Sequence, residues 1–128
     1  MKKVILILLA LLLLVGCAQT EETVQEAVYM NITADEAKKI MDTEEGYVML
    51  DVRTQEEFDQ GHIPGAILIP DYDIEAKAET VLTDKNQQIL VYCRSGRRSK
   101  LAAEALVKLG YTNIKEFGGI IDWPYEVE

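Results

Sequence analysis

The segment VYCRSGRRSK, residues 91–100, carries the clearest chemical signal in this sequence. It places Cys93 at the end of an apolar run and follows it with Gly96 and four cations, Arg94, Arg97, Arg98 and Lys100. The whole chain has 22 acidic and 13 basic residues and a formal charge of −9, so a dense basic cluster is unusual within it. A thiol surrounded by cations indicates a nucleophilic cysteine beside a site for a small anion.

The elements on either side of this segment favour the same interpretation. Residues 88–92 have the pattern of a buried strand and residues 99–109 that of an amphipathic helix, so residues 93–98 form a connecting loop, here called the cysteine loop. Gly96 allows a tight turn that points amide N–H groups inward, and the helix adds the positive end of its dipole. Both effects favour the thiolate. A lone cysteine or an arginine cluster alone is common in ordinary proteins, but their combination favours a reactive site.

Three blocks of the sequence resemble the signature of the rhodanese domain. They are LDVRTQEEFDQGHIPGAILIP, VYCRSGRRS and FGGIIDW, which stand in the family's order and extend the resemblance over roughly residues 31–127. The resemblance implies a rhodanese-like α/β fold in which Cys93 takes a sulfane sulfur and becomes a persulfide. The five residues that follow it would wrap around the sulfur and bind the anion: Arg94, Ser95, Gly96, Arg97 and Arg98.

The same resemblance implies a sulfurtransferase. We expect no cofactor, and one histidine and one free cysteine leave too few ligands for a zinc site. Thiosulfate or a similar sulfur-bearing anion would be the donor, and a thiol or cyanide the acceptor. Because Arg98 matches the family's loop arginine, we expect it to point inward, whereas Arg94 and Arg97 line the rim. These arginines would attract and hold a donor anion that the net acidic chain would otherwise repel.

Other polar residues near these blocks have simpler interpretations. Asp51 and Arg53 end a strand beside the predicted site; they either help to hold its loops or form a buried ion pair that supports a turn. We favour the ion pair, because sulfur transfer needs neither residue as an acid or base. His62, the only histidine, lies in the turn GHIPG and is interpreted as structural. Gly118, Gly119 and Trp123 are interpreted as packing residues.

Two other functions remain as alternatives. Phosphatases and arsenate reductases related to the rhodanese fold use Cys-x5-Arg, but the sixth position after Cys93 is Ser99, and Arg98 comes one residue too early. A binding or sulfur-carrier module that keeps the fold without turnover is the second alternative. Such modules commonly lack the cysteine, whereas this chain keeps it together with the whole loop.

Apolar and amphipathic runs alternate from residue 29 onward. We expect strands at residues 29–32, 47–52, 66–69, 88–92 and 114–117, and helices at 33–42, 55–60, 73–81 and 99–109, with a final turn at 118–123. Such alternation predicts an α/β domain with a central, mainly parallel β-sheet flanked by helices on both faces. Its functional site should lie at the carboxyl ends of the strands. The last helix should turn Leu101, Ala102, Ala105, Leu106 and Leu109 inward and end at Gly110.

The first residues have the pattern of a secretory signal. Lys2 and Lys3 precede the apolar run 4–15, which is shorter than the roughly 20 residues of a membrane span. The run ends in Leu-Val-Gly-Cys, residues 14–17, which resembles the lipobox of bacterial lipoproteins. The resemblance implies that Cys17 is acylated and becomes the first residue of the mature chain.

These features predict a signal peptide at 1–16, a lipidated acidic tether at 17–28 and one rhodanese-like domain at 29–128. The lipid bilayer would then be a partner through Cys17, and the domain, expected to be a monomer, would face outside the cytoplasm. Loss of Lys2 and Lys3 would leave 11 basic residues against 22 acidic ones, which argues against nucleic acid as a partner.

Overall fold

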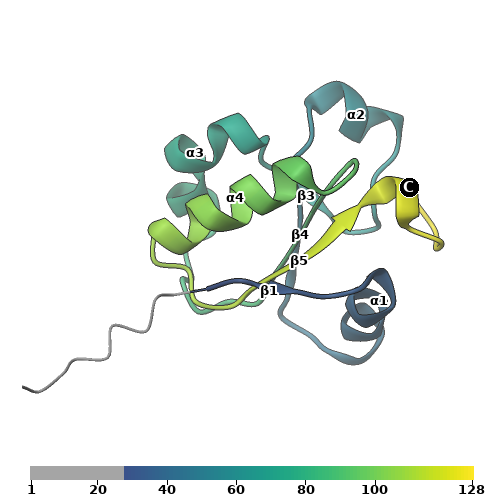
Figure 1. The fold of residues 1–128 in the computed structure, drawn as a ribbon, viewed down its shortest axis with the longest axis horizontal. Helices are drawn as coiled ribbons and strands as arrows, with labels where there is room; N and C mark the ends of the chain where they lie inside the picture. Colours follow the sequence, from purple (N-terminus) through teal and green to yellow (C-terminus); the bar gives the residue numbers. More distant parts are fainter. Residues whose placement is uncertain (1–27) are drawn as a thin grey trace, which may run out of the picture.

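The computed structural model describes residues 28–128 and contains one five-stranded sheet. The proposed signal peptide, Cys17 and nearly all of the proposed tether lie outside the described residues. The strands, all parallel, lie in the order β1-β5-β4-β2-β3 (Figure 1). They are β1 (Met30–Asn31), β2 (Val48–Asp51), β3 (Ile67–Leu68), β4 (Ile89–Cys93) and β5 (Ile114–Gly119). The predicted α/β fold is confirmed.

Within residues 28–128, four helices and one 3₁₀ turn connect the strands, and a second 3₁₀ turn follows the last strand. The helices are α1 (Ala34–Thr43), α2 (Gln55–Gln60), α3 (Ile74–Val81) and α4 (Arg97–Lys108), and the 3₁₀ turns are η1 (Asp71–Asp73) and η2 (Ile120–Asp122). Thr33 and Glu36 form the capping box that the sequence predicted for α1, and Thr54 and Glu57 form a second one at α2. Within residues 28–128 no helix is both long and apolar enough to cross a bilayer.

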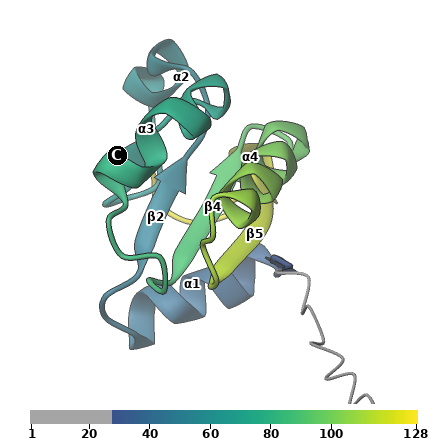
Figure 2. The same cartoon turned by 90° about the vertical axis from the view of Figure 1, so that its left-hand side faces the viewer.

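Helices cover both faces of the sheet, as the alternating pattern predicts. Figure 1 shows α3 and α4 on one side of the strands and α1 on the other, and Figure 2 shows the arrows of β2 and β4 pointing the same way. One core cluster joins α3 and α4 to the sheet through Ile74, Ala102 and Leu106. The opposite cluster joins α1 through Ala37 and Ile40 to Tyr92 and its neighbours. The central strand β4 is buried along its whole length.

Helix α4 differs from its predicted form at its start and on its inward face. It begins at Arg97 rather than near Ser99, because Gly96 adopts a φ of +106° and turns the chain directly into the helix. The predicted inward residue Leu101 is 49% exposed, so that prediction is wrong. The predicted Ala102 and Leu106 are buried, and Ala105 and Leu109 are partly buried against the same core. Ser99 and Ala103, which were not predicted, are buried as well, and the buried positions follow the 3- and 4-residue spacing of one helix face.

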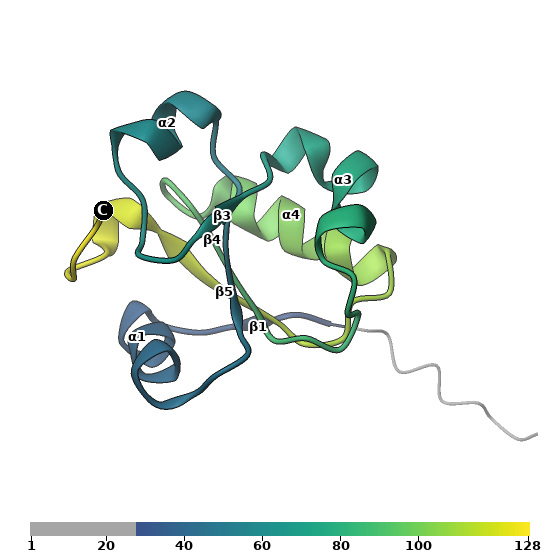
Figure 3. The ribbon, with the colours of Figure 1, turned by 180° about the vertical axis from the view of Figure 1, so that it is seen from behind.

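The C-terminal segment folds back between α1 and α2 (Figure 3). Glu128 exchanges two backbone hydrogen bonds with His62, at 2.9 and 2.8 Å. The His62 ring stacks on Phe58 with centroids 3.9 Å apart, and its Nε2 lies 3.3 Å from a carboxylate oxygen of Glu128. The contacts with Glu128 hold the C-terminal segment and the stack holds His62 against α2, in line with the structural role that the sequence indicated for His62.

Candidate active site

Cys93 is the last residue of β4, the central strand of the sheet. Because the strands are parallel, their carboxyl ends lie at the same edge of the sheet. Asp51, the last residue of the neighbouring β2, pairs in register with Tyr92. Figure 1 shows the β4–α4 connection at the same end of the sheet as α2 and the C-terminal turn. The topology thus gathers the cysteine loop, the end of β2 and the end of β5 at one edge, as expected for a site in an open parallel sheet.

The Cys93 sulfur lies inside a nest of donors. Its residue is 1% exposed, the Gly96 N–H donates to Sγ at 2.9 Å, and the Ser99 hydroxyl lies 3.4 Å from Sγ. Burial raises the pKa of the thiol, but the Ser99 hydroxyl and the backbone N–H groups of Ser99, Gly96 and Ser95 outweigh it and hold that pKa below its usual value. The geometry therefore favours a thiolate, which is the nucleophilic form.

The cysteine loop is pressed against the end of β5. A methyl group on Gly119 would stand 1.9 Å from the Arg94 carbonyl oxygen and 2.5 Å from the Ser95 nitrogen. The Ile121 N–H donates to the same Arg94 carbonyl at 3.2 Å. Gly119 is thus a packing residue, as predicted, and it packs against the backbone that directly follows Cys93.

The loop arginines differ in their surroundings. Arg94 and Arg97 are exposed, whereas Arg98 is half-buried in the first turn of α4. Arg98 donates from both terminal nitrogens to the two carboxylate oxygens of Glu57, at 2.6 and 3.0 Å. This bond lowers the pKa of Glu57 from 4.5 to about 2. A carboxylate from α2 therefore neutralises part of the basic cluster, which the sequence did not indicate.

Asp51 and Arg53 form a buried ion pair. Arg53 donates to both carboxylate oxygens, at 3.0, 3.1 and 2.7 Å, and also donates to the Gly61 carbonyl at 2.7 Å. The Tyr92 hydroxyl donates to Asp51 at 2.6 Å and accepts from the Ile63 N–H at 3.1 Å. Burial and the bond to Asp51 raise the pKa of Tyr92, which stays a donor. The network ties β2 and β4 to the turn around residues 61–63.

Tyr92→Phe should lower stability while sparing sulfur chemistry. The change removes one donor to the buried Asp51 and leaves the buried Ile63 N–H without its acceptor, at a cost of about 1–3 kcal/mol. Urea denaturation measures the loss. Tyr72→Phe is the matched control, because Tyr72 is exposed and its loss of a hydroxyl should change little. Equal stability of the two variants would contradict this account of the network.

Two buried residues at the site, Ser99 and Glu116, were not identified from the sequence as site residues. The Ser99 hydroxyl bonds to a Glu116 carboxylate oxygen at 2.6 Å, and the Gly118 N–H donates to the same oxygen at 2.8 Å. Glu116 is 2% exposed. One signal could have revealed it: Glu116 stands two residues after the buried Ile114 in β5, where an apolar residue would share that face.

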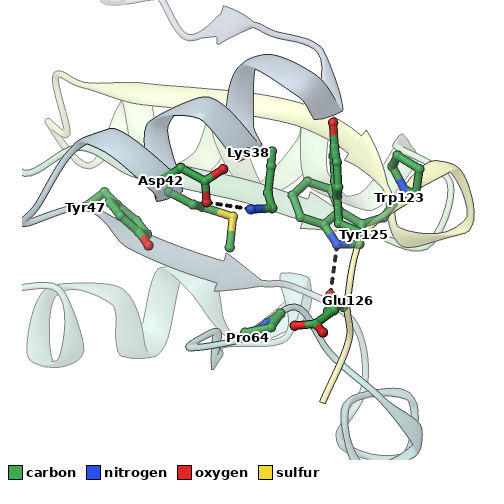
Figure 4. Close-up of a pocket in the computed structure, with 9 residues that line it drawn as sticks. Lys38, Asp42, Tyr47, Pro64, Trp123, Tyr125 and Glu126 are labelled. Carbon is green, nitrogen blue, oxygen red and sulfur yellow. Dashed lines mark hydrogen bonds and ion pairs between the residues drawn. The ribbon is translucent and has the colours of Figure 1, made fainter.

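Two neighbouring pockets lie on this side of the molecule. One, of roughly 400 Å³, adjoins the cysteine loop at Arg94 and is also lined by Arg53 and Glu57. The other, of roughly 740 Å³, lies between α1 and the C-terminal segment and includes Lys38 and Tyr125 (Figure 4). Trp123 lines both pockets. Within residues 28–128 no group of three potential metal ligands gathers.

Comparison with known proteins identifies the family of this site. A model of the rhodanese-like domain matches residues 33–124, and the chain belongs to that family. The thiosulfate sulfurtransferase PspE of Escherichia coli is 41% identical over 73 residues, which are 57% of this chain and 70% of PspE. The Bacillus subtilis protein YrkF, named as a candidate sulfur carrier, is 36% identical over 98 residues, covering 76% of this chain and 52% of YrkF. This chain therefore spans about half of YrkF.

The structure also resembles solved members of the family. A rhodanese with anions from E. coli superposes with a TM-score of 0.60 at 36% identity, over 64% of this chain and 96% of the solved one. The rhodanese resemblance read from the three sequence blocks is therefore confirmed for the domain. The roles of the individual residues stay predictions.

Proposed function

We propose that this protein is a membrane-anchored sulfurtransferase. It takes a sulfane sulfur from thiosulfate or a similar donor onto Cys93 and passes it to a thiophilic acceptor such as a thiol or cyanide. The observation that supports this most directly is the Cys93 sulfur, held by the Gly96 N–H at 2.9 Å with a lowered pKa. Family membership and relatives named as sulfurtransferases support sulfur transfer in general.

The reaction needs two displacements at sulfur. The Cys93 thiolate attacks the outer sulfur of thiosulfate, and a bond forms between Cys93 Sγ and that sulfur. The S–S bond of thiosulfate breaks at the same time, and sulfite leaves with its electron pair. The acceptor then attacks the outer sulfur of the persulfide and regenerates the thiolate. The loop N–H groups that favour the thiolate before the first step also stabilise it as the leaving group of the second.

Intact mass after thiosulfate exposure, together with turnover in the presence of cyanide, tests this function. A carrier module is the second candidate, supported by the likeness to YrkF and by the burial of Cys93. A carrier would gain one sulfur per chain and show no steady-state turnover with small acceptors. An enzyme would gain the sulfur and release it repeatedly as thiocyanate.

The loop arginines should promote donor binding to different degrees. Arg94→Gln and Arg97→Gln remove exposed charges and should lower kcat/KM for thiosulfate roughly 2- to 5-fold. Both effects should shrink with added salt, because screening acts over about 10 Å at 0.1 M. Arg98→Gln should cost on the order of 10-fold, since it removes a cation and also frees the Glu57 carboxylate.

Glu57→Gln is the matched control for Arg98→Gln, because it should change kcat/KM in the opposite direction. It releases the Arg98 guanidinium, so thiosulfate kcat/KM should rise, and the double variant should lie between the two single ones. If all the arginine variants equal the wild type at low and high salt, the basic cluster does not bind the donor.

Anchoring rests on the residues before the domain and is likewise a proposal. Cys17→Ser should leave an unprocessed precursor and abolish the partitioning of the mature protein into detergent. Membrane fractionation and the N-terminal mass measure both effects. Wild-type protein found in the cytoplasm with Met1 still present would contradict the proposed anchor.

A further inference from the structure

The Ser99 hydroxyl stands at the centre of a buried polar cluster. Its oxygen lies 2.6 Å from a Glu116 carboxylate oxygen and 3.4 Å from the Cys93 sulfur. The carbonyl oxygens of Gly96 and Gly118 lie 3.0 and 3.3 Å from it. Ser99, Glu116 and Cys93 are all nearly inaccessible to water. The proposed sulfur transfer uses the Cys93 sulfur but assigns no role to the buried Glu116 carboxylate.

The number of protons in this cluster is limited. A hydroxyl has one proton to donate, and the two carbonyl groups can only accept. If both Cys93 and Glu116 were ionised, Ser99 would face four acceptors with one proton, and two negative charges would share a dry site. The geometry therefore suits one additional proton, which stands either on the sulfur or on the carboxylate.

We propose that Glu116 stores the proton of the Cys93 thiol and that Ser99 passes it between them. In the resting form the thiol donates to Ser99 and Ser99 donates to the Glu116 carboxylate. In the reactive form the Cys93 S–H bond has broken and its proton is bonded to the Ser99 oxygen. The former Ser99 proton is bonded to Glu116, and the new Ser99 O–H donates to the thiolate.

The transfer keeps the buried charge constant. One negative charge moves from carboxylate to sulfur, so the protein forms its nucleophile without burying a second charge and without losing a proton to water. When the acceptor later releases Cys93 as a thiolate, the stored proton is already in place beside it. Glu116 acts only through Ser99, so it is a positioning residue. The inference rests on the proposed function in that Cys93 is taken as the nucleophile.

Among residues 28–128, the charged and titratable groups that interact with the cluster come from α4, α2, η1 and the segment before β1. Arg98 of α4 interacts electrostatically with Cys93, and Arg98 is itself neutralised in part by Glu57 of α2 and influenced by Asp71 of η1. Tyr29, which precedes β1, interacts electrostatically with Glu104 of α4 and with Glu116. The positive charge of Arg98 favours the thiolate form. Tyr29 stays neutral, so the charge on Cys93 depends mainly on where the shared proton is bound.

A shared proton has a distinctive pH dependence. Over the pH range in which Cys93 and Glu116 share one additional proton, the fraction of thiolate depends only on the relative proton affinities of the sulfur and the carboxylate. That fraction therefore does not change with pH. The thiolate of the wild type should therefore appear in two steps separated by a plateau. The difference in ultraviolet thiolate absorbance between wild type and Cys93→Ala measures it in the full chain, and the subtraction cancels Cys17 and the tyrosines.

Three variants test the proposal. Glu116→Gln keeps the shape and cannot take up the proton, so thiolate formation should become a single step. Ser99→Ala removes the hydroxyl that couples the two groups, so a single step should appear at higher pH than in the wild type. Glu104→Gln is the matched control, since it removes an exposed carboxylate of α4 and should retain both steps.

A wild-type titration with one step, or two steps retained in Glu116→Gln, overturns the proposal. Infrared spectroscopy of the wild type gives a second measurement that does not depend on the variants folding. At the plateau pH, the free protein should show a protonated-carboxyl band that disappears when iodoacetamide blocks Cys93, and absence of this band also overturns it. Neither measurement involves a sulfur donor, so the proposed sulfurtransferase activity can fail while this inference stands, or the reverse.

Discussion

Replacement of Cys93 by alanine or serine is expected to abolish both the persulfide and turnover. Wild-type protein exposed to thiosulfate should gain about 32 Da, one sulfur atom, which cyanide or dithiothreitol removes, and neither variant should gain it. The physical reason is that no other described side chain offers a thiolate at the loop. Electrospray mass spectrometry and a thiosulfate–cyanide assay measure the two effects.

The serine variant separates chemistry from folding. Cys93 is part of the buried core and its sulfur accepts the Gly96 N–H, so alanine leaves that N–H without a partner, at about 1–3 kcal/mol. Cys93→Ser keeps an acceptor and should stay closer to wild-type stability. Undiminished sulfur transfer by either variant would overturn the persulfide mechanism.

Gly119→Ala should have the second largest effect, although Gly119 takes no part in the chemistry. The added methyl group would stand 1.9 Å from the Arg94 carbonyl oxygen, a backbone atom that moves only with the cysteine loop. Overpacking of this kind costs typically 1–3 kcal/mol in stability. Displacement of the nucleophile by about 1 Å can lower the rate on the order of 100-fold. Thermal unfolding and thiosulfate kinetics measure the two losses separately.

Gly46→Ala is the control for Gly119→Ala. Gly46 has a φ of +76° with no atom within 4 Å of the added methyl group, so alanine there introduces backbone strain without a clash. It should lower stability by roughly 1–2 kcal/mol and leave kcat/KM unchanged. If Gly119→Ala forms persulfide at the wild-type rate, the loop accommodates the methyl group without moving Cys93, and the packing argument is wrong.

Local patterns were sufficient for most of the fold. The alternation of buried strands and amphipathic helices depends on the nearest few residues, so each element of the sheet and its covering helices was predicted within a few residues. Capping at Thr33 was predicted for the same reason. The predicted start of α4 was wrong because the φ of Gly96 decides where the helix begins. The prediction for Leu101 was wrong because apolar residues alone do not define which face of the helix is buried.

The sequence by itself was sufficient to predict the family, the cysteine loop and Cys93 as the candidate nucleophile, because Cys93, Gly96 and the arginines are contiguous and their chemistry follows from residue type. Only the tertiary structure decided which residues the loop meets. Glu57 and Arg98 are 41 residues apart, and Ser99 and Glu116 are 17 apart. Their contacts follow from β5 lying beside β4 and from α2 reaching the same edge of the sheet, an arrangement set by the order and register of strands. Strand order is a property of the packed core as a whole, so a local pattern can suggest that Glu116 is buried but cannot place its carboxylate beside the thiol.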